Sequence, residues 1–526
     1  MRFWTARLLS AAVVFATLSA SAVGDRFAGM DRSKFHIGAY FLRDWVLWDG
    51  SGASRIRDFM ECGHDMLVMA DNWDSGIRMF ESYGLPVIIT GVLPAGIFGP
   101  KVNNVDEITN EDYDEAVRTN FTDNACICGV DVRDEPVAQN FPRLAGLVEH
   151  FDSIFTNKFP FVNLLPTYCP TNILGTSSYK EYIDAYCNSF PTLDYICYDH
   201  YVYETKSVGG FLRNLAVVAD ACLRTDRSLW IVPQVGAEHA DRRPLASDQF
   251  RYQAFASMAF GAETIFWGCY MQGWYGYMPL SSSGEKQEVY YSLKEANTDI
   301  RRLADDYMKF RRVETWCVGF GATNWLTAAD SVAYTTVHMS DSFDWGDFAD
   351  VHAEDGGPIL AAALESRSGD GRKALFVMAA DDPNALAQRR RRVLIDVSVA
   401  EESDGRMRVF RAVGSNAAFA PEIAGDGVIA LPLWSNEAAL IQLVEPYVQR
   451  GDQSAEEADE FDDVWRSVAA SDEAGILLNM PAEPSAATES KAVAQTGFDN
   501  QWRATAVSSP VDEILLGGPM LMIILR

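Results

Sequence analysis

Short apolar, β-branched runs alternate with stretches of helical periodicity through the first 310 residues of the chain. Apolar runs of this length are typical of strands, and an apolar face that returns every three to four residues is typical of helices. The runs predict strands at 35–41, 65–70, 86–91, 127–132, 161–166, 195–198, 229–235 and 263–270. Helices are predicted between and after them, for example at 54–62, 74–82, 110–118, 143–155, 178–187, 211–225, 247–260 and 288–310.

Eight strands, each followed by a helix, across residues 33–312 predict a (β/α)8 TIM barrel and therefore an α/β fold class. A doubly wound open sheet would show a similar alternation, but no glycine-rich phosphate-binding loop follows any of these strands. The barrel is therefore the better prediction. It would place functional residues at the carboxyl ends of the strands.

The pattern changes after residue 318, where β-rich runs are separated by turn sequences. Residues 318–447 are therefore predicted to form a small antiparallel β-sandwich, from runs at 332–337, 374–380, 392–399, 407–412 and 438–444. Residues 448–526 are rich in Asp, Glu, Ala and Ser, which predicts an acidic, disordered tail. Its apolar end at 514–525 is too short to span a bilayer, so no stable membrane insertion is expected.

The N-terminus has the pattern of a secretory signal peptide. Arg2 and Arg7 precede an apolar run over 8–18, and Ala20-Ser21-Ala22 fits a cleavage site. Residues 1–24 are therefore predicted to be a signal peptide, with a secreted or periplasmic protein as the product. The alternative is a buried N-terminal helix, since the run is too short for a membrane-spanning one.

Composition narrows the possible partners. The chain of 526 residues has 44 Lys and Arg against 73 Asp and Glu, a formal net charge of −29. Nucleic-acid binding needs a basic surface, so no nucleic-acid partner is expected. A hydrophobic fraction of 48% excludes disorder of the whole chain. An aromatic fraction of 12%, including 13 Trp, favours a carbohydrate substrate, because sugar rings present apolar faces to Trp and Tyr. The sequence leaves the oligomeric state open.

The Cys and His content gives little support for a metal. Nine Cys are sparse for a disulfide scaffold, although Cys169 and Cys187 could form a bridge. Five Cys in apolar, strand-like surroundings are interpreted as small buried apolar residues, and these are Cys62, Cys126, Cys128, Cys197 and Cys269. His200 and His239 could ligate a metal beside Asp199 and Glu238, but no paired-His motif such as HExxH is present. The sequence predicts no metal and no cofactor.

Carboxyl groups occur at the predicted ends of the fourth and sixth strands. The fourth ends in Asp134-Glu135-Pro136 and the sixth in Asp199-His200. Pro136 is expected to make Glu135 extended and to end strand pairing there. A carboxylic acid desolvated at the mouth of a barrel has a raised pKa and can protonate a leaving oxygen. Glycoside hydrolysis needs two such carboxyl groups.

The sequence Gly-Val-Asp-Val-Arg-Asp-Glu-Pro at 129–136 resembles the strand-four segment of bacterial (β/α)8 glycoside hydrolases of clan A, including the β-galactosidase-type family 42. The stretches 195–201, 251–267 and 291–297 resemble the sixth strand, the helix with the eighth strand, and the helix that follows it in those enzymes. The resemblance implies that Glu135 is the general acid/base.

One position departs from this resemblance. Clan A enzymes carry a nucleophilic Glu at the end of strand seven, where this chain has Gln234. Asp199 or Glu238 would then supply the second catalytic carboxyl group, or the enzyme would invert configuration by activating water. The other alternative is a non-catalytic carbohydrate-binding protein on a barrel that has lost hydrolysis.

The sequence as a whole predicts a secreted glycoside hydrolase that cleaves O-glycosidic bonds of oligosaccharides or polysaccharides. Its catalytic candidates are Glu135, Asp199 and Glu238. Polar and aromatic residues at the strand ends are predicted to bind the sugar, and these are Trp45, Trp73, Asp134, Tyr168, His200, Tyr201, Gln234, Trp267 and Trp274.

Overall fold

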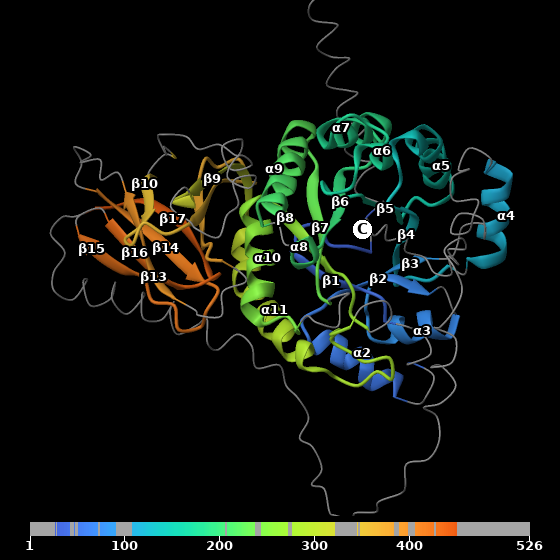
Figure 1. The fold of residues 1–526 in the computed structure, drawn as a ribbon, viewed down its shortest axis with the longest axis horizontal. Helices are drawn as coiled ribbons and strands as arrows, with labels where there is room; N and C mark the ends of the chain where they lie inside the picture. Colours follow the sequence, from blue (N-terminus) through green and yellow to red (C-terminus); the bar gives the residue numbers. More distant parts are fainter. Residues whose placement is uncertain are drawn as a thin grey trace, which may run out of the picture. The chain divides into compact units, whose positions relative to one another are not determined.

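A computed structural model gives the fold of the chain (Figure 1). The residues that it describes are 27, 29–42, 47, 51–71, 74–90, 108–121, 123–205, 208–236, 243–271, 276–320, 345, 348–382, 389–397, 406–425 and 428–449. The predicted signal peptide and all but the first two residues of the predicted tail lie outside them. In the part of the chain so described, no helix is both long enough and apolar enough to cross a bilayer.

The N-terminal region is a closed parallel barrel, as the sequence predicted. Each strand pairs in parallel with the next, and the last pairs with the first, His36 opposite Thr264. The strands are β1 (His36–Tyr40), β2 (Met66–Asp71), β3 (Val87–Thr90), β4 (Ile127–Asp134), β5 (Phe159–Leu164), β6 (Tyr195–His200), β7 (Ser228–Pro233) and β8 (Ala262–Trp267).

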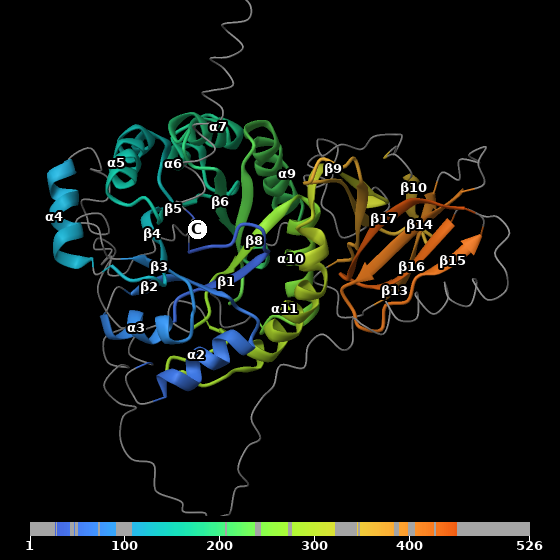
Figure 2. The same cartoon turned by 180° about the vertical axis from the view of Figure 1, so that it is seen from behind.

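Helices surround this barrel (Figures 1 and 2). Two begin at side-chain caps that the sequence encodes: Thr109 and Asp112 form a capping box, and Ser178 accepts a hydrogen bond from the Glu181 amide. The helices are α2 (Gly52–Glu61), α3 (Asp74–Ser82), α4 (Asn110–Asn120), α5 (Phe141–Ile154), α7 (Tyr179–Ser189), α9 (Val208–Thr225), α10 (Ser247–Ala259) and α11 (Glu288–Tyr307), with the short turns η4 (Ala138–Asn140), α6 (Thr171–Leu174) and α8 (Val202–Thr205).

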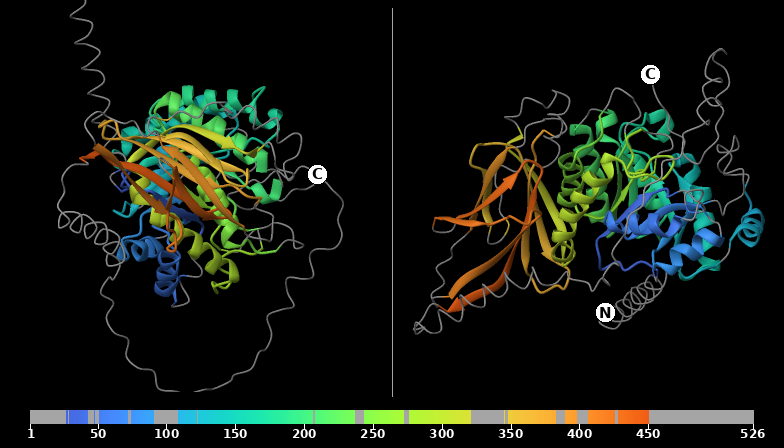
Figure 3. Two further views of the ribbon diagram at one scale, coloured as in Figure 1. Left: turned by 90° about the vertical axis from the view of Figure 1, so that its left-hand side faces the viewer. Right: turned by 90° about the horizontal axis from the view of Figure 1, so that it is seen from below.

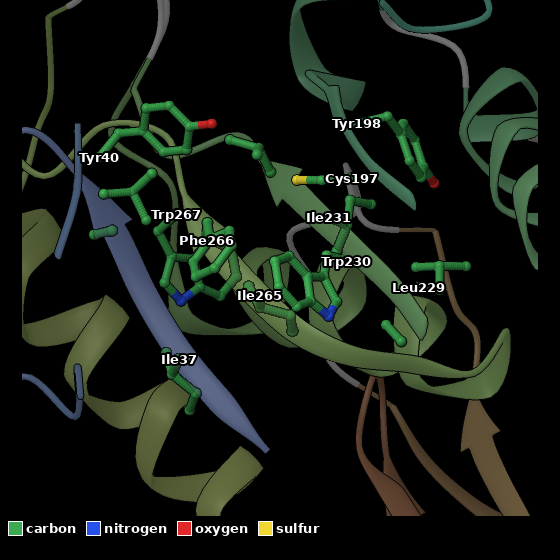
Figure 4. Packing of buried hydrophobic residues seen from close by; sticks show 14 of the residues in the cluster. Ile37, Tyr40, Cys197, Tyr198, Leu229, Trp230, Ile231, Ile265, Phe266 and Trp267 are labelled. Carbon is green, nitrogen blue, oxygen red and sulfur yellow. The ribbon is translucent and has the colours of Figure 1, made fainter. Parts of the chain in front are cut away.

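Aromatic side chains fill the interior of the barrel. Tyr195 stacks on Trp230 with ring centroids 4.0 Å apart, and Phe161 and Phe266 lie edge-on at 5.9 Å. Figure 4 shows Trp230 and Phe266 packed together, with Cys197 nearby. The interior is thus a packed core rather than a channel, so a ligand can be bound only at an end of the barrel.

Two antiparallel sheets follow the barrel (Figure 3). One has the order β10-β13-β16-β15 and the other β14-β17-β12-β11-β9. Both belong to the same compact unit of the chain as the barrel, apart from the ends of β14 and β17. The strands are β9 (Phe310–Val318), β10 (Phe348–Ala353), β11 (Ile359–Ser366), β12 (Lys373–Ala379), β13 (Arg390–Val397), β14 (Arg406–Gly414), β15 (Glu422–Gly425), β16 (Val428–Trp434) and β17 (Ala438–Gln449).

The two sheets share one core. Leu375 and Val377 of β12 pack in a cluster with Val393 and Leu431 of the other sheet, as expected for a sandwich. Phe376, between them in the sequence, belongs instead to the large cluster that includes the barrel, and its ring lies 5.8 Å from that of Tyr307. The five-stranded sheet is therefore buried on both faces.

Candidate active site

A β-bulge in β4 brings two acids to the interior of the barrel. Asp131 pairs with Phe161 and Asp134 with Asn163, and the register shifts between Asp131 and Arg133. Side chains of a regular strand alternate between its faces, so residues three apart point in opposite directions. The bulge adds one residue to β4 and lets Asp131 and Asp134 share a face. Both are buried, with exposed fractions of 1% and 9%.

Glu135 follows directly, in a backbone conformation that is unusual for a residue with a side chain. Its φ is +47°, in the left-handed region. The expectation of an extended residue before Pro136 is therefore wrong. Two hydrogen bonds hold this turn: the Glu135 amide donates to the Asn163 carbonyl at 2.8 Å, and the Tyr182 hydroxyl donates to the Pro136 carbonyl at 2.6 Å. A conformation of this kind costs about 1–3 kcal/mol, and such strain is concentrated at functional sites.

Three carboxyl groups from two strands form one hydrogen-bonded group, here called the acid cluster (Asp134, Glu135 and Asp199). The side-chain amide of Asn163 donates to Asp134 Oδ1 at 3.0 Å and to Asp199 Oδ1 at 3.2 Å. The carboxyl groups of Glu135 and Asp199 are hydrogen-bonded to each other. The sequence predicted all three acids for the site, and the structure brings them into contact.

Burial changes the proton affinity of every acid in the cluster. Desolvation raises the pKa of Asp134 to about 6, against the opposing effects of Asn163 and Arg133. Desolvation, with the charge of Asp134, raises the pKa of Asp199 to about 7. For Glu135, desolvation and then the charges of Asp199 and Asp134 raise the pKa well above its usual range. The hydrogen bond between the two groups raises the pKa of Glu135 and lowers that of Asp199, so a single proton shared by the pair is held by Glu135.

His200 lies beside the acid cluster on β6, but its ring faces helix α9. It is buried, and desolvation lowers its pKa to about 4, so the ring is neutral at neutral pH. Nδ1 lies 2.9 Å from Asn214 Oδ1, an oxygen that also accepts from the Thr167 amide. Because that oxygen can only accept, Nδ1 carries the proton and Nε2 is left as an acceptor. The ring of Tyr168, 44% exposed, lies edge-on to His200 at 5.0 Å.

Gln234 fills a structural role at the end of β7. Its carbonyl oxygen accepts from the Tyr203 amide at 2.8 Å, and its amide nitrogen donates to the Gly236 carbonyl at 2.7 Å. The side chain is 2% exposed. Both polar atoms of its side chain therefore bond to backbone groups, at the position where clan A enzymes carry their nucleophilic Glu.

The structure does not bring Trp267 to the acid cluster. Its indole is fully buried and donates to Asn297 Oδ1 on α11 at 2.9 Å, and its ring packs edge-on against Phe250 on α10. The ring therefore lies in the layer between the barrel and its helices. Tyr201 is also buried, but its hydroxyl lies next to Gly268, just after the end of β8.

The remaining predicted site residues lie outside the described residues. These are Trp45, Trp73, Glu238 and Trp274. Their roles stay predictions.

The structure adds residues that sequence reasoning missed. Asn163 contacts two of the three acids, and the carboxylate of Asp131 is buried with neither oxygen hydrogen-bonded among the described residues. The signal for Asn163 was a polar residue within the otherwise apolar run 159–164. Its position two residues after inward-facing Phe161 would have placed it inside the barrel.

The described residues offer no group of three or more His, Cys, Asp or Glu side chains arranged to hold a metal ion. All nine Cys are free thiols, so Cys169 and Cys187 are not bridged.

No protein-family model matches the sequence, and no curated protein matches it. Among solved structures, the chain is similar to a β-galactosidase from Halorubrum lacusprofundi, with 11% identity and a TM-score of 0.36 over 51% of this chain and 58% of that one. It is also similar to a β-galactosidase from Marinomonas ef1, with 10% identity and a TM-score of 0.41 over 52% and 62%. SrfJ from Salmonella typhimurium matches with 9% identity and a TM-score of 0.39 over 78% and 89%.

The chain thus spans about three fifths of the length of the two β-galactosidases. Matches at these identities and TM-scores carry no information on activity. The assignment of chemistry depends on the residues of the barrel itself.

Proposed function

We propose that the barrel hydrolyses O-glycosidic bonds of an oligosaccharide or polysaccharide, with Glu135 as general acid and Asp199 as the second carboxyl group. The observation that supports this most is the direct hydrogen bond between Glu135 and Asp199, at the carboxyl ends of β4 and β6. Two carboxyl groups beside the scissile bond are what glycoside hydrolysis requires.

Their different proton affinities support the division of roles. The hydrogen bond between the two carboxyl groups raises the pKa of Glu135 and lowers that of Asp199, so a single proton on the pair belongs to Glu135. Glu135 would give this proton to the glycosidic oxygen as the C–O bond breaks. Asp199, ionised, would attack the anomeric carbon or take a proton from the attacking water.

The spacing of the cluster favours attack by the carboxylate. Asp199 contacts Glu135 directly, and an arriving glycosidic oxygen would replace that hydrogen bond. Retaining enzymes hold their two carboxyl groups about 5–5.5 Å apart, whereas inverting enzymes leave about 6.5–9.5 Å for a water molecule. A pair in contact has less far to move to reach the retaining distance.

Other residues would bind the sugar around this pair. Asp134 would accept a sugar hydroxyl, and the exposed ring of Tyr168 would pack against the apolar face of a sugar. The predicted roles of Trp45, Trp73 and Trp274 belong to the same proposal. Export through the N-terminal signal sequence is also part of it, and N-terminal sequencing of protein secreted by an expressing host would test that step.

The activity test uses matched substitutions. The purified protein is assayed for release of reducing sugar on a panel of polysaccharides and aryl glycosides, and Glu135→Gln is expected to lower kcat by about 10²–10⁴-fold. Glu149→Gln, an exposed position on α5, is the control and should match the wild type. Unchanged turnover in Glu135→Gln would contradict the assignment.

Gln234 favours a second candidate, a non-catalytic carbohydrate-binding protein. Its side chain is committed to the backbone and supplies no carboxylate at the end of β7. This candidate predicts that calorimetry detects sugar binding while no panel substrate is hydrolysed. Turnover that depends on Glu135 would exclude it.

A further inference from the structure

Asn163 is a polar residue at the centre of the acid cluster. It lies on β5, between the strands that carry the acids, and is 2% exposed. Its side-chain nitrogen has two N–H groups, and these reach Asp134 Oδ1 and Asp199 Oδ1 at 3.0 and 3.2 Å. Both donors therefore contact carboxyl groups, one on β4 and one on β6.

Cys197 fixes which way this amide points. Its thiol donates to Asn163 Oδ1 at 3.7 Å, from the β6 position two residues before Asp199. The thiol is fully buried, and burial raises its pKa well above the usual range, so it stays protonated and able to donate. With the amide oxygen directed at Cys197, the amide nitrogen must face the acids.

We propose that Asn163 is a positioning residue that holds Asp134 and Asp199 in register with each other and stabilises their ionised forms, with Cys197 setting the orientation of its amide. The effect of Asn163 on turnover depends on the function proposed above. Its effect on the ionisation of the acids does not.

The physical reason is the imbalance of charge around the two acids. Hydrogen bonds to an ionised carboxylate are about twice as strong as those to a neutral group. In the part of the chain that the structure describes, the acidic and basic side chains that face Asp134 and Asp199 are Asp131 and Arg133 on β4 and Glu135 directly after it. The other titratable groups around them stay neutral between pH 5 and pH 8. These are Tyr40 on β1, Cys169 after β5, Tyr179 on α7, and Cys197 and Tyr198 on β6. Asn163 is the neutral donor shared by both acids.

The test compares Asn163→Leu with the wild type by thermal melting across pH. Leu keeps the approximate volume and removes the amide. At pH 5 the native acids are mostly protonated in both proteins, and the difference in Tm reflects packing alone. As pH rises to 8, the acids of the Leu variant must either stay protonated or ionise without the hydrogen bonds from Asn163. The Tm of the variant is therefore expected to fall below that of the wild type by about 4 °C more at pH 8 than at pH 5.

A second buried asparagine is the matched control. Asn297 is fully buried, donates to the Cys62 carbonyl and accepts from Trp267, with no carboxyl group among these partners. Asn297→Leu should lower Tm by the same amount at pH 5 and pH 8. A pH-independent deficit for Asn163→Leu as well would overturn the proposal.

Activity supplies a second readout. Asn163→Leu should shift the acidic limb of the kcat/KM profile to higher pH by about one unit, because Asp199 would ionise at a higher pH. Asn163→Ser, which retains one donor, and Cys197→Ala, which frees the amide to turn, should give smaller shifts in the same direction. An unshifted limb in all three active variants would count against the proposal. If the wild type hydrolyses no substrate, the proposed function fails, and the melting comparison still decides the role of Asn163.

Discussion

Glu135 is half-buried, has two acidic neighbours and lies in a strained backbone conformation. Burial and the charges of Asp199 and Asp134 all favour its protonated form. The left-handed turn fixes where the carboxyl group lies, because the backbone on either side is hydrogen-bonded to β5 and to Tyr182. A general acid needs both properties, a retained proton and a fixed position.

The pH profile of activity follows from the proton affinities of the pair. Asp199 must be ionised and Glu135 protonated, so kcat/KM should rise with pH through an apparent pKa near 7 and fall again at higher pH. Asp134→Asn removes a charge that raises the pKa of both residues. Both limbs of the kcat/KM profile should therefore move to lower pH by about one unit. A steady-state profile of both proteins from pH 4 to 10 checks this, and a shift to higher pH would contradict it.

Sequence reasoning found the acids but not what holds them. Asp134, Glu135 and Asp199 could be predicted because each ends a strand, and the strand ends of a barrel meet. Asn163 could not be singled out in the same way, since its importance comes from the two carboxyl groups that it reaches on neighbouring strands. Trp267 was predicted to bind the sugar, but its indole faces helix α11. At a strand end, the sequence does not show whether a side chain points to the mouth of the barrel or to the surrounding helices.

At the scale of elements, the end of β4 is the part of the barrel that departs most from regular geometry. The eight strands could be predicted because their short β-branched, apolar runs recur at regular intervals between helical stretches. The bulge between Asp131 and Arg133 and the left-handed Glu135 could not. Both depend on pairing with β5, which no local pattern in the β4 sequence encodes.

The left-handed turn predicts an order of stability for two substitutions. Glu135→Gly should be more stable than Glu135→Ala by about 1 kcal/mol, because only glycine adopts a positive φ without strain. In a regular strand the order would be reversed. Urea denaturation of both variants at one pH measures the difference. An alanine variant as stable as the glycine variant would mean that the turn is not left-handed.

At the scale of the whole molecule, the buried acids make stability depend on pH. Their pKa values are raised on folding, so the native state binds more protons than the unfolded chain. The stability that this contributes is complete below the unfolded pKa of about 4 and is lost as pH rises through about 6 to 7. The Tm of the wild type should therefore be higher at pH 5 than at pH 8.

Asp131 offers the clearest single contribution to this effect. Its carboxylate is buried, its oxygens have no hydrogen-bond partner among the described residues, and burial raises its pKa well above the usual range. Asp131→Asn should raise Tm by about 3 °C or more at pH 7 and have little effect near pH 4. Scanning calorimetry at both pH values tests this. Asp305→Asn, at an exposed site on α11, should change Tm at neither pH, and a pH-independent gain in Asp131→Asn would refute the explanation.

The role of Glu135 as the proton donor can be measured most directly through the leaving group. Hydrolysis of an aryl glycoside needs a proton donor only when the departing phenol is a weak acid. Glu135→Gln should therefore lose at least about 10²-fold in kcat/KM on a phenyl glycoside and much less on the dinitrophenyl glycoside of the same sugar. Equal losses on both substrates would show that Glu135 does not donate the proton, and the proposed mechanism would be wrong.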